Sequence, residues 1–118
     1  MKNKTFFDSI KCALRGLFAG IKTEKNFRVY FVIAAVFFAL NLLLKISLTE
    51  HIVYFGICAG VFSAEFLNTA IEHLSNLISE EFNNRIKLAK DIAAAGVLVW
   101  GFVFFGMEIA FTVRHFVL

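Results

Sequence analysis

The polar residues best placed for chemistry in this chain interrupt an otherwise apolar stretch. They are Glu65, Asn68, Thr69 and Glu72, at positions i, i+3, i+4 and i+7. On a helix this spacing puts all of them on one face, over two turns. An acidic residue costs roughly 2.5 to 3.5 kcal/mol at the centre of a membrane-spanning helix. A protein that keeps two such residues uses them to bind a cation, move protons or perform acid–base chemistry.

A purely structural role would explain only one of the two carboxylates on this polar face. Glu72 alone would fit the solvated end of a spanning helix, whereas Glu65 follows a long apolar run and precedes Phe66 and Leu67. Seven residues of helix separate the two carboxylates by about 10 Å. The pattern therefore favours a functional site that is wetted at Glu72 and deeper in the membrane at Glu65.

Further charged residues are predicted at the same depth as Glu72. They are Glu24, before the first long apolar run, and the pair Lys90 and Asp91, at the start of the last one. Carboxylates with a lysine suit a polyphosphate and its Mg²⁺, which is usually held by one or two carboxylates plus phosphate oxygens. No G-x-x-x-x-G-K-[ST] phosphate loop is present, so phosphates would be held by the metal, Lys90 and the N-terminal end of the third spanning helix. On position alone, Lys90 also fits a lysine that flanks a membrane span.

The elements that must position these residues are predicted to be membrane helices. The chain has 118 residues, 59% of them hydrophobic, with 16 Phe and no Pro, and its charged residues (18%) are bunched. The apolar runs between the bunches have no polar stripe and are long enough to cross a bilayer, which takes about 20 residues of helix. The predicted fold is an all-α integral membrane protein with one domain, residues 1–118. It has an amphipathic surface helix over 5–23, spanning helices over 27–46, 52–74 and 91–113, and a solvated loop over 75–88.

The positions of the basic residues predict the orientation. Lysines and arginines before the first span and between the second and third outnumber those on the other side by ten to two. By the positive-inside rule the N-terminus is cytoplasmic and the C-terminus is outside. Glu108, near the outer end of the third span, is expected to be interfacial.

Four segments resemble the prokaryotic diacylglycerol kinase family, the small trimeric membrane lipid kinases that include undecaprenol kinases. They are R-G at 15–16, T-E-K-N-F-R at 23–28, E-F-L-N-T-A-I-E at 65–72 and A-K-D-I-A-A-A at 89–95. The resemblance covers nearly the whole chain. It implies a homotrimer in the bacterial cell (inner) membrane, with sites between subunits, that transfers the γ-phosphoryl group of ATP to a lipid hydroxyl.

The resemblance also implies roles for the acidic residues. Glu65 matches the general base that takes the proton from the lipid hydroxyl as its oxygen attacks the γ-phosphorus. Glu24 and Glu72 match the carboxylates that bind Mg²⁺. Phosphoryl transfer needs positioning and charge neutralisation more than covalent help from the protein, which agrees with this set of residues.

Other positions match the family's nucleotide and substrate contacts. Lys90 matches the lysine on the phosphates, Asp91 its polar neighbour, and Asn68 an amide that can orient Glu65 or a phosphate oxygen. Glu81 corresponds weakly to an acid near the adenosine, and Arg15 matches a supporting position. The chain departs from the family at two places: Asn76 stands where Asp is usual, and Cys12 where an aromatic residue is often found.

Two lipids and one different class of protein remain as alternatives. E-H at 72–73, F-S-x-E at 62–65 and A-A-A-G at 93–96 look more like the undecaprenol kinases than the diacylglycerol kinases of enterobacteria. Undecaprenol is therefore favoured as the substrate over diacylglycerol. A non-catalytic channel or transporter would need acids accessible from both faces, whereas the acids here are predicted to gather at one face.

Overall fold

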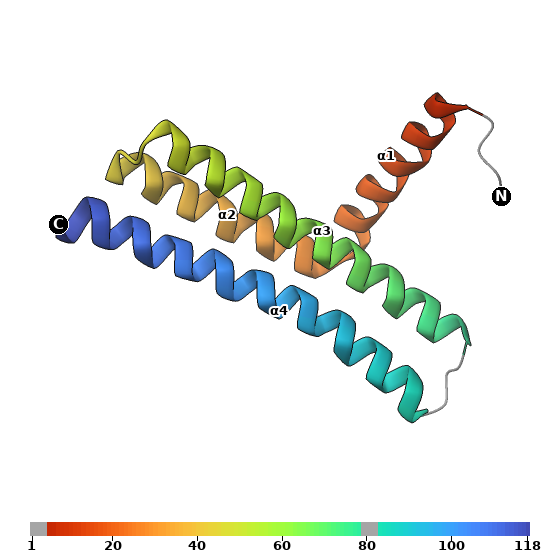
Figure 1. The fold of residues 1–118 in the computed structure, drawn as a ribbon. Helices are drawn as coiled ribbons and strands as arrows, with labels where there is room; N and C mark the ends of the chain where they lie inside the picture. Colours follow the sequence, from red (N-terminus) through yellow and green to blue (C-terminus); the bar gives the residue numbers. More distant parts are fainter. Residues whose placement is uncertain (1–4, 79–82) are drawn as a thin grey trace.

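The computed structural model describes residues 5–78 and 83–118, and most of these residues are helical (Figure 1). In chain order the helices are α1 (Phe6–Thr23), α2 (Lys25–Leu44), α3 (Leu48–Ile78) and α4 (Asn84–Thr112), the last continuing into a short π-helical segment, η1 (Val113–Val117). Three of them, α2, α3 and α4 with η1, are long and apolar enough to cross a membrane. This confirms the prediction of an all-helical chain with three membrane-capable helices.

Helix α1 projects away from the other helices (Figure 1). Thr5 caps its start, because the Thr5 hydroxyl accepts from the backbone N–H of Asp8 at 3.2 Å. None of its residues is buried, and its apolar side chains are exposed. The helix ends where Glu24 adopts an extended backbone, with φ −105° and ψ 117°. Glu24 therefore occupies the corner at which the chain turns into α2.

The corner between α1 and α2 packs on α3 through aromatic side chains. Phe27 is fully buried, and its ring lies 4.2 Å from the ring of Phe66 between centroids. A Cβ at Gly20 would come within 2.9 Å of the Phe66 ring, so a glycine is required for this close approach. These contacts hold Glu24 beside the polar face of α3.

The turn between α2 and α3 is fixed by a reciprocal pair of caps. The Ser47 hydroxyl accepts from the backbone N–H of Glu50 at 3.2 Å, and the Glu50 carboxylate accepts from the backbone N–H of Ser47 at 3.0 Å. This is a capping box, which satisfies two donors at the start of a helix. Lys45 closes α2 in the left-handed conformation, with φ 55°. We refer to this end of the molecule as the Glu50 end and to the opposite end as the Glu72 end.

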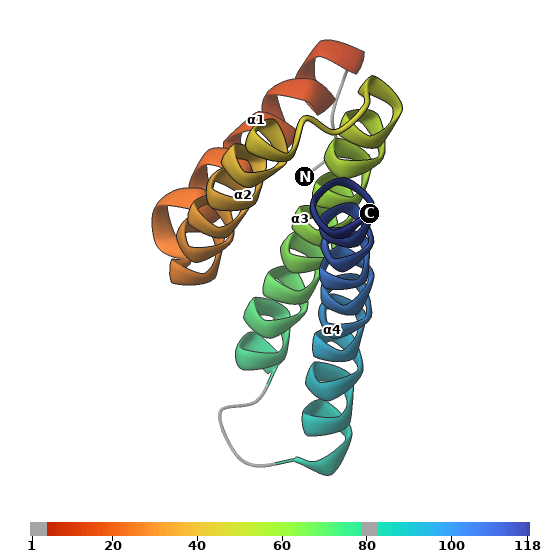
Figure 2. The ribbon, with the colours of Figure 1, turned by 90° about the vertical axis from the view of Figure 1, so that its left-hand side faces the viewer.

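Helices α3 and α4 run side by side along most of their length, and α2 stands against them with fewer contacts (Figures 1 and 2). A Cβ at Gly60 would come within 2.5 Å of the Trp100 ring, so this glycine lets the two long helices approach. The core lies toward the Glu50 end. Its buried apolar members are Ile46, Tyr54, Phe104, Met107 and Phe111.

Two expectations from the sequence are wrong in detail. The predicted loop over 75–88 is shorter, because α3 continues to Ile78 and α4 begins at Asn84. The Asn83 side chain caps the start of α4 by accepting from the backbone N–H of Arg85 at 2.9 Å. The polar residues that follow Asn83 therefore belong to the helix and not to the loop. Glu108 is not exposed, as an interfacial acid would be: it is 3% exposed and accepts a hydrogen bond from Asn41 of α2 at 2.8 Å.

Candidate active site

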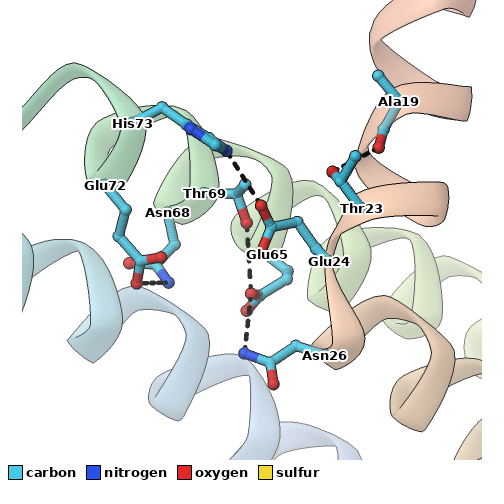
Figure 3. A network of polar contacts seen from close by, with 9 residues as sticks. All are labelled: Ala19, Thr23, Glu24, Asn26, Glu65, Asn68, Thr69, Glu72 and His73. Atoms are coloured by element: carbon cyan, nitrogen blue, oxygen red, sulfur yellow. Dashed lines mark hydrogen bonds and ion pairs between the residues drawn. The ribbon is translucent and has the colours of Figure 1, made fainter. Parts of the chain in front are cut away.

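Glu65 is the buried centre of the polar face on α3. It is 2% exposed, and one of its carboxylate oxygens accepts from Asn26 Nδ2 at 3.4 Å and from Thr69 Oγ1 at 3.5 Å (Figure 3). Charge-assisted hydrogen bonds to a carboxylate are usually about 2.7 to 2.9 Å long. The Tyr30 hydroxyl is a further hydrogen-bonding neighbour of this carboxylate. Because the bonds from Asn26 and Thr69 are long, Glu65 can still accept from a donor that enters the site.

Asn68 and Glu72 form the next part of the polar face. Asn68 Nδ2 donates to Glu72 Oε1 at 3.2 Å. Asn68 is 6% exposed, and its Oδ1 is buried without a hydrogen-bond partner among the described residues. Asn68 thus orients Glu72 rather than Glu65 in this structure, and it presents an unused acceptor inside the site.

Glu24 pairs with a residue to which the sequence analysis gave no role. Its Oε1 lies 3.0 Å from His73 Nε2, which joins the α1–α2 corner to α3 (Figure 3). No hydrogen bond links Glu24 to Glu72. Within residues 5–78 and 83–118, no three His, Cys, Asp or Glu side chains gather into a metal-binding group.

A hollow of about 480 Å³ opens beside Glu65 between α2, α3 and α4. Its polar end is lined by Asn26, Glu65, Asn68 and Glu72, and its far end by Phe104 and Phe105. This volume lies in the usual range of ligand pockets, which is about 300 to 1,000 Å³. The pocket can therefore take a molecule with a polar head and an apolar body, whose polar head would meet Glu65.

The basic residues near the start of α4 make contacts within the chain. Lys90 Nζ donates to Asn76 Oδ1 at 2.7 Å, and Lys87 Nζ lies 2.8 Å from Asp91 Oδ2. Lys87 and Asp91 are both more than half exposed, so their pair contributes less than about 1 kcal/mol. Asn76, the departure from the family pattern, therefore binds the lysine that was predicted to hold phosphates.

The N-terminal end of α4 lies away from Lys90, the residue with which it was predicted to hold phosphates. Helix α4 begins at Asn84, six residues before Lys90, a distance of about 9 Å along the axis. The field of a helix terminus falls off within the first turn. Lys90 therefore lies on the side of the helix, beyond the first turn.

Comparison with known proteins identifies the chemistry. Residues 11–112 match the prokaryotic diacylglycerol kinase family. The chain belongs to this family. It is 37% identical over 98 residues to the undecaprenol kinase of Bacillus subtilis (strain 168), an alignment that covers 83% of this chain and 80% of that protein. The protein is a lipid kinase, as the sequence motifs predicted.

The oxygen ligands that this kinase offers fit Mg²⁺. Hard cations take oxygen ligands, and Mg²⁺ is usually bound by one or two carboxylates together with substrate phosphates. Glu72 uses one carboxylate oxygen in its contact with Asn68, and Glu24 uses one in its contact with His73. Each therefore has an oxygen to offer, and phosphate oxygens would complete the coordination.

The structure brings only some of the predicted site residues of the kinase together. Glu65, Asn68 and Glu72 line one pocket. Arg15 is exposed on α1 and forms no hydrogen bond or ion pair with any described residue. Glu81 lies outside the described residues.

Sequence reasoning assigned no role to Asn26, Tyr30 and His73, which contact the site. Asn26 donates to Glu65, and His73 holds Glu24. Asn26 lies within the T-E-K-N-F-R segment that carried part of the resemblance, and His73 directly follows Glu72. Their positions in these motifs were the available signal. Their contacts depend on how α2 and the α1–α2 corner meet α3, which helical spacing does not specify.

Proposed function

We propose that this kinase phosphorylates undecaprenol at the expense of ATP, with Glu65 as the general base. The observation that carries the proposal is the position of Glu65, a buried carboxylate where the polar end of a 480 Å³ pocket meets its apolar part. A lipid alcohol entering from the membrane would place its hydroxyl at Glu65 and its chain toward Phe104 and Phe105. The similarity to a named undecaprenol kinase supports this lipid over diacylglycerol.

The proposed step is an in-line transfer. The lipid hydroxyl donates its proton to Glu65 while its oxygen forms a bond to the γ-phosphorus, and the bond from the γ-phosphorus to the bridging oxygen breaks to release ADP. Glu65 suits this role because its hydrogen bonds, at 3.4 and 3.5 Å, leave room for a stronger donor. The unused Asn68 Oδ1 is a second acceptor for that hydroxyl before the proton moves.

Glu24 and Glu72 are proposed to hold Mg²⁺ together with the phosphates. When bound, the metal neutralises charge on the transferring group. Glu24 would exchange its contact with His73 for the metal, and Glu72 would offer the oxygen that Asn68 does not use. Asn68 thereby keeps the Glu72 carboxylate oriented.

The nucleotide is proposed to lie on the open side of the same cluster. Lys90 would exchange the Asn76 oxygen for phosphate oxygens, and Asp91 would stay beside it. Both residues are accessible, and Asp91 pairs with the exposed Lys87. Two further assignments rest on the family resemblance alone. Glu81 is assigned to the adenosine side of the site, and Arg15 is assigned a supporting role in substrate binding.

We further propose that α1 lies in the membrane interface and that the kinase assembles as a homotrimer in the bacterial inner membrane. No residue of α1 is buried within the chain, and Phe6, Phe7 and Phe18 are exposed, which suits an interfacial helix. The excess of basic residues at the Glu72 end supports a cytoplasmic position for this end and the N-terminus, with the C-terminus outside. The active site would then face the compartment that supplies ATP.

The test is a transfer assay with purified protein in lipid vesicles, MgATP and either undecaprenol or diacylglycerol. We expect transfer to undecaprenol, at least tenfold faster than to diacylglycerol. Phosphorylation of diacylglycerol alone would overturn the proposed substrate. The Glu65→Gln variant, folded but inactive on both lipids, would support Glu65 as the base.

A further inference from the structure

A buried acid–amide pair joins α2 to α4 on the Glu50 side of the active-site pocket. Asn41 is 0% exposed and Glu108 is 3% exposed, and Asn41 Nδ2 donates to Glu108 Oε1 at 2.8 Å. Glu108 lies six residues before Arg114 near the end of the chain, or about 9 Å inward along the helix. The pair therefore lies well inside the apolar part of a spanning helix, where ionisable residues are rare and usually functional.

Each member of the pair has a second polar side-chain atom that the hydrogen bond between them does not use. Asn41 Oδ1 and Glu108 Oε2 are buried, and neither has a hydrogen-bond partner among the described residues. With an ionised carboxylate both atoms are acceptors, so neither can satisfy the other. A proton on Oε2 turns one of them into a donor, and the acid and the amide can then close a second hydrogen bond between them.

The surroundings of Glu108 also favour a neutral carboxyl group. The titratable side chains that face it are Tyr54 and Cys58 of α3, neither of which is a cation. The Tyr54 hydroxyl donates to the backbone carbonyl of Ala34, so its proton is already used. Among the residues that the structure describes, Glu108 has no ion-pair partner.

The pair lies one helical turn beyond the apolar end of the pocket. Asn41 is one turn along α2 from Phe37, and Glu108 is one turn along α4 from Phe104. The Phe37 ring packs against the Phe104 and Phe105 rings, at 5.4 and 5.8 Å between centroids. Helix α2 supplies one wall of the pocket and touches α3 and α4 at few places. A bond from α2 to α4 at this level therefore sets how far that wall can move.

We propose that Glu108 keeps its proton and forms a doubly hydrogen-bonded acid–amide pair with Asn41, which positions α2 as the lipid-binding wall of the active-site pocket. Asn41 and Glu108 are positioning residues that act through α2 on the lipid and on Asn26, the donor to Glu65. The effect on the lipid rests on the proposed function, whereas the protonation of Glu108 is independent of it.

The first experiment is infrared spectroscopy of the full chain in lipid vesicles at neutral pH, comparing the unsubstituted protein with Glu108→Gln. We expect the difference spectrum to show the loss of a protonated carboxyl carbonyl band. Loss of an ionised carboxylate band instead would overturn the proposal. This measurement needs no catalytic activity, so it stands even if undecaprenol is not the substrate.

The second experiment measures KM for undecaprenol and for MgATP separately. A glutamine at 108 can form the same two hydrogen bonds with Asn41, so Glu108→Gln should keep both constants within about twofold. Glu108→Leu and Asn41→Leu should raise the lipid KM about tenfold, as expected when a wall of a binding site is released, and leave the MgATP KM within about twofold. If Glu108→Gln is as impaired as Glu108→Leu, the neutral pair is wrong.

A double variant tests the positioning role even if the single variants misfold. Asn41→Leu with Glu108→Leu removes both polar groups, which is better tolerated in a buried site than leaving one of them unpaired. We expect this variant to fold and still to show the raised lipid KM, because apolar contacts do not fix the register of α2 against α4. A double variant with a lipid KM equal to that of the unsubstituted protein would show that the pair has no positioning role.

Discussion

Polar side chains gather at both ends of the helices, but they are bonded differently at the two ends. At the Glu50 end, Glu50 accepts from Ser47 at 3.0 Å and contacts His115 at 2.7 Å, and Arg114 lies 3.5 Å away. At the Glu72 end, the bonds to Glu65 are 3.4 and 3.5 Å long and an oxygen of Asn68 has no partner among the described residues. The contrast is between Glu50, whose several contacts hold the fold, and Glu65, whose two long bonds leave it able to accept from a further donor.

The difference has a physical cause. A buried polar group that is fully satisfied within the chain stabilises a single arrangement, whereas a partly satisfied one lowers stability unless a ligand completes it. Glu50 ties the start of α3 to η1 through His115, which closes the Glu50 end of the molecule. Glu65 borders an open pocket of about 480 Å³. Matched substitutions at the two ends should therefore have opposite effects on stability and activity.

The largest effect is expected for Glu65→Gln. Removal of a general base typically lowers the rate by roughly 10² to 10⁴-fold. Because the bonds to Glu65 are long, the thermal unfolding temperature in detergent should change little. The measurement is ATP-dependent phosphorylation of undecaprenol, with circular dichroism as the check on folding. Retention of more than a tenth of the activity would remove Glu65 from the role of base.

The metal-binding carboxylates come next. Glu72→Gln and Glu24→Gln should each lower activity roughly ten- to a hundredfold and raise the Mg²⁺ concentration that gives half-maximal activity. The measurement is a Mg²⁺ titration at saturating ATP. The control is His73→Ala, which frees the Glu24 carboxylate and should shift the Mg²⁺ requirement less than either glutamine variant. An unchanged Mg²⁺ requirement in both glutamine variants would contradict the proposed metal site.

Glu50→Ala should produce the opposite pattern. It removes a buried carboxylate that bonds Ser47, His115 and Arg114, so unfolding should become easier by roughly 2 to 4 kcal/mol. The activity of the protein that remains folded should stay within about twofold. The measurement is chemical denaturation alongside the transfer assay. A loss of activity with unchanged stability would abolish the contrast between the two ends.

The smallest effect is expected for Asn76→Asp. The substitution turns the 2.7 Å hydrogen bond from Lys90 into an ion pair near the surface, so stability should rise by no more than about 1 kcal/mol. Since Lys90 would then be held more strongly, the KM for ATP should rise up to about threefold. Lys90→Ala is the matched control, and its KM for ATP should rise further. A fall in that KM for Asn76→Asp would show that Asn76 does not compete for the lysine.

The sequence by itself determined the local features of this protein. Apolar runs of sufficient length predicted the three membrane-capable helices, and the spacing of Glu65, Asn68 and Glu72 placed them on one face. The motifs at 65–72 and 89–95 were enough for the family and the lipid kinase activity. These features follow from helical periodicity and from short motifs. Each of them can therefore be predicted from one continuous stretch of the chain.

Only the tertiary structure decided which distant residues meet. The contacts of Glu24 with His73, Lys90 with Asn76 and Glu108 with Asn41 each join two different helices or the corner between them. Each depends on the rotation and offset of one helix against another, which periodicity within a single helix does not define. The same reason explains why Glu108 was expected at the interface and is instead buried. An acid near the end of a span is hidden only when a neighbouring helix offers it a partner.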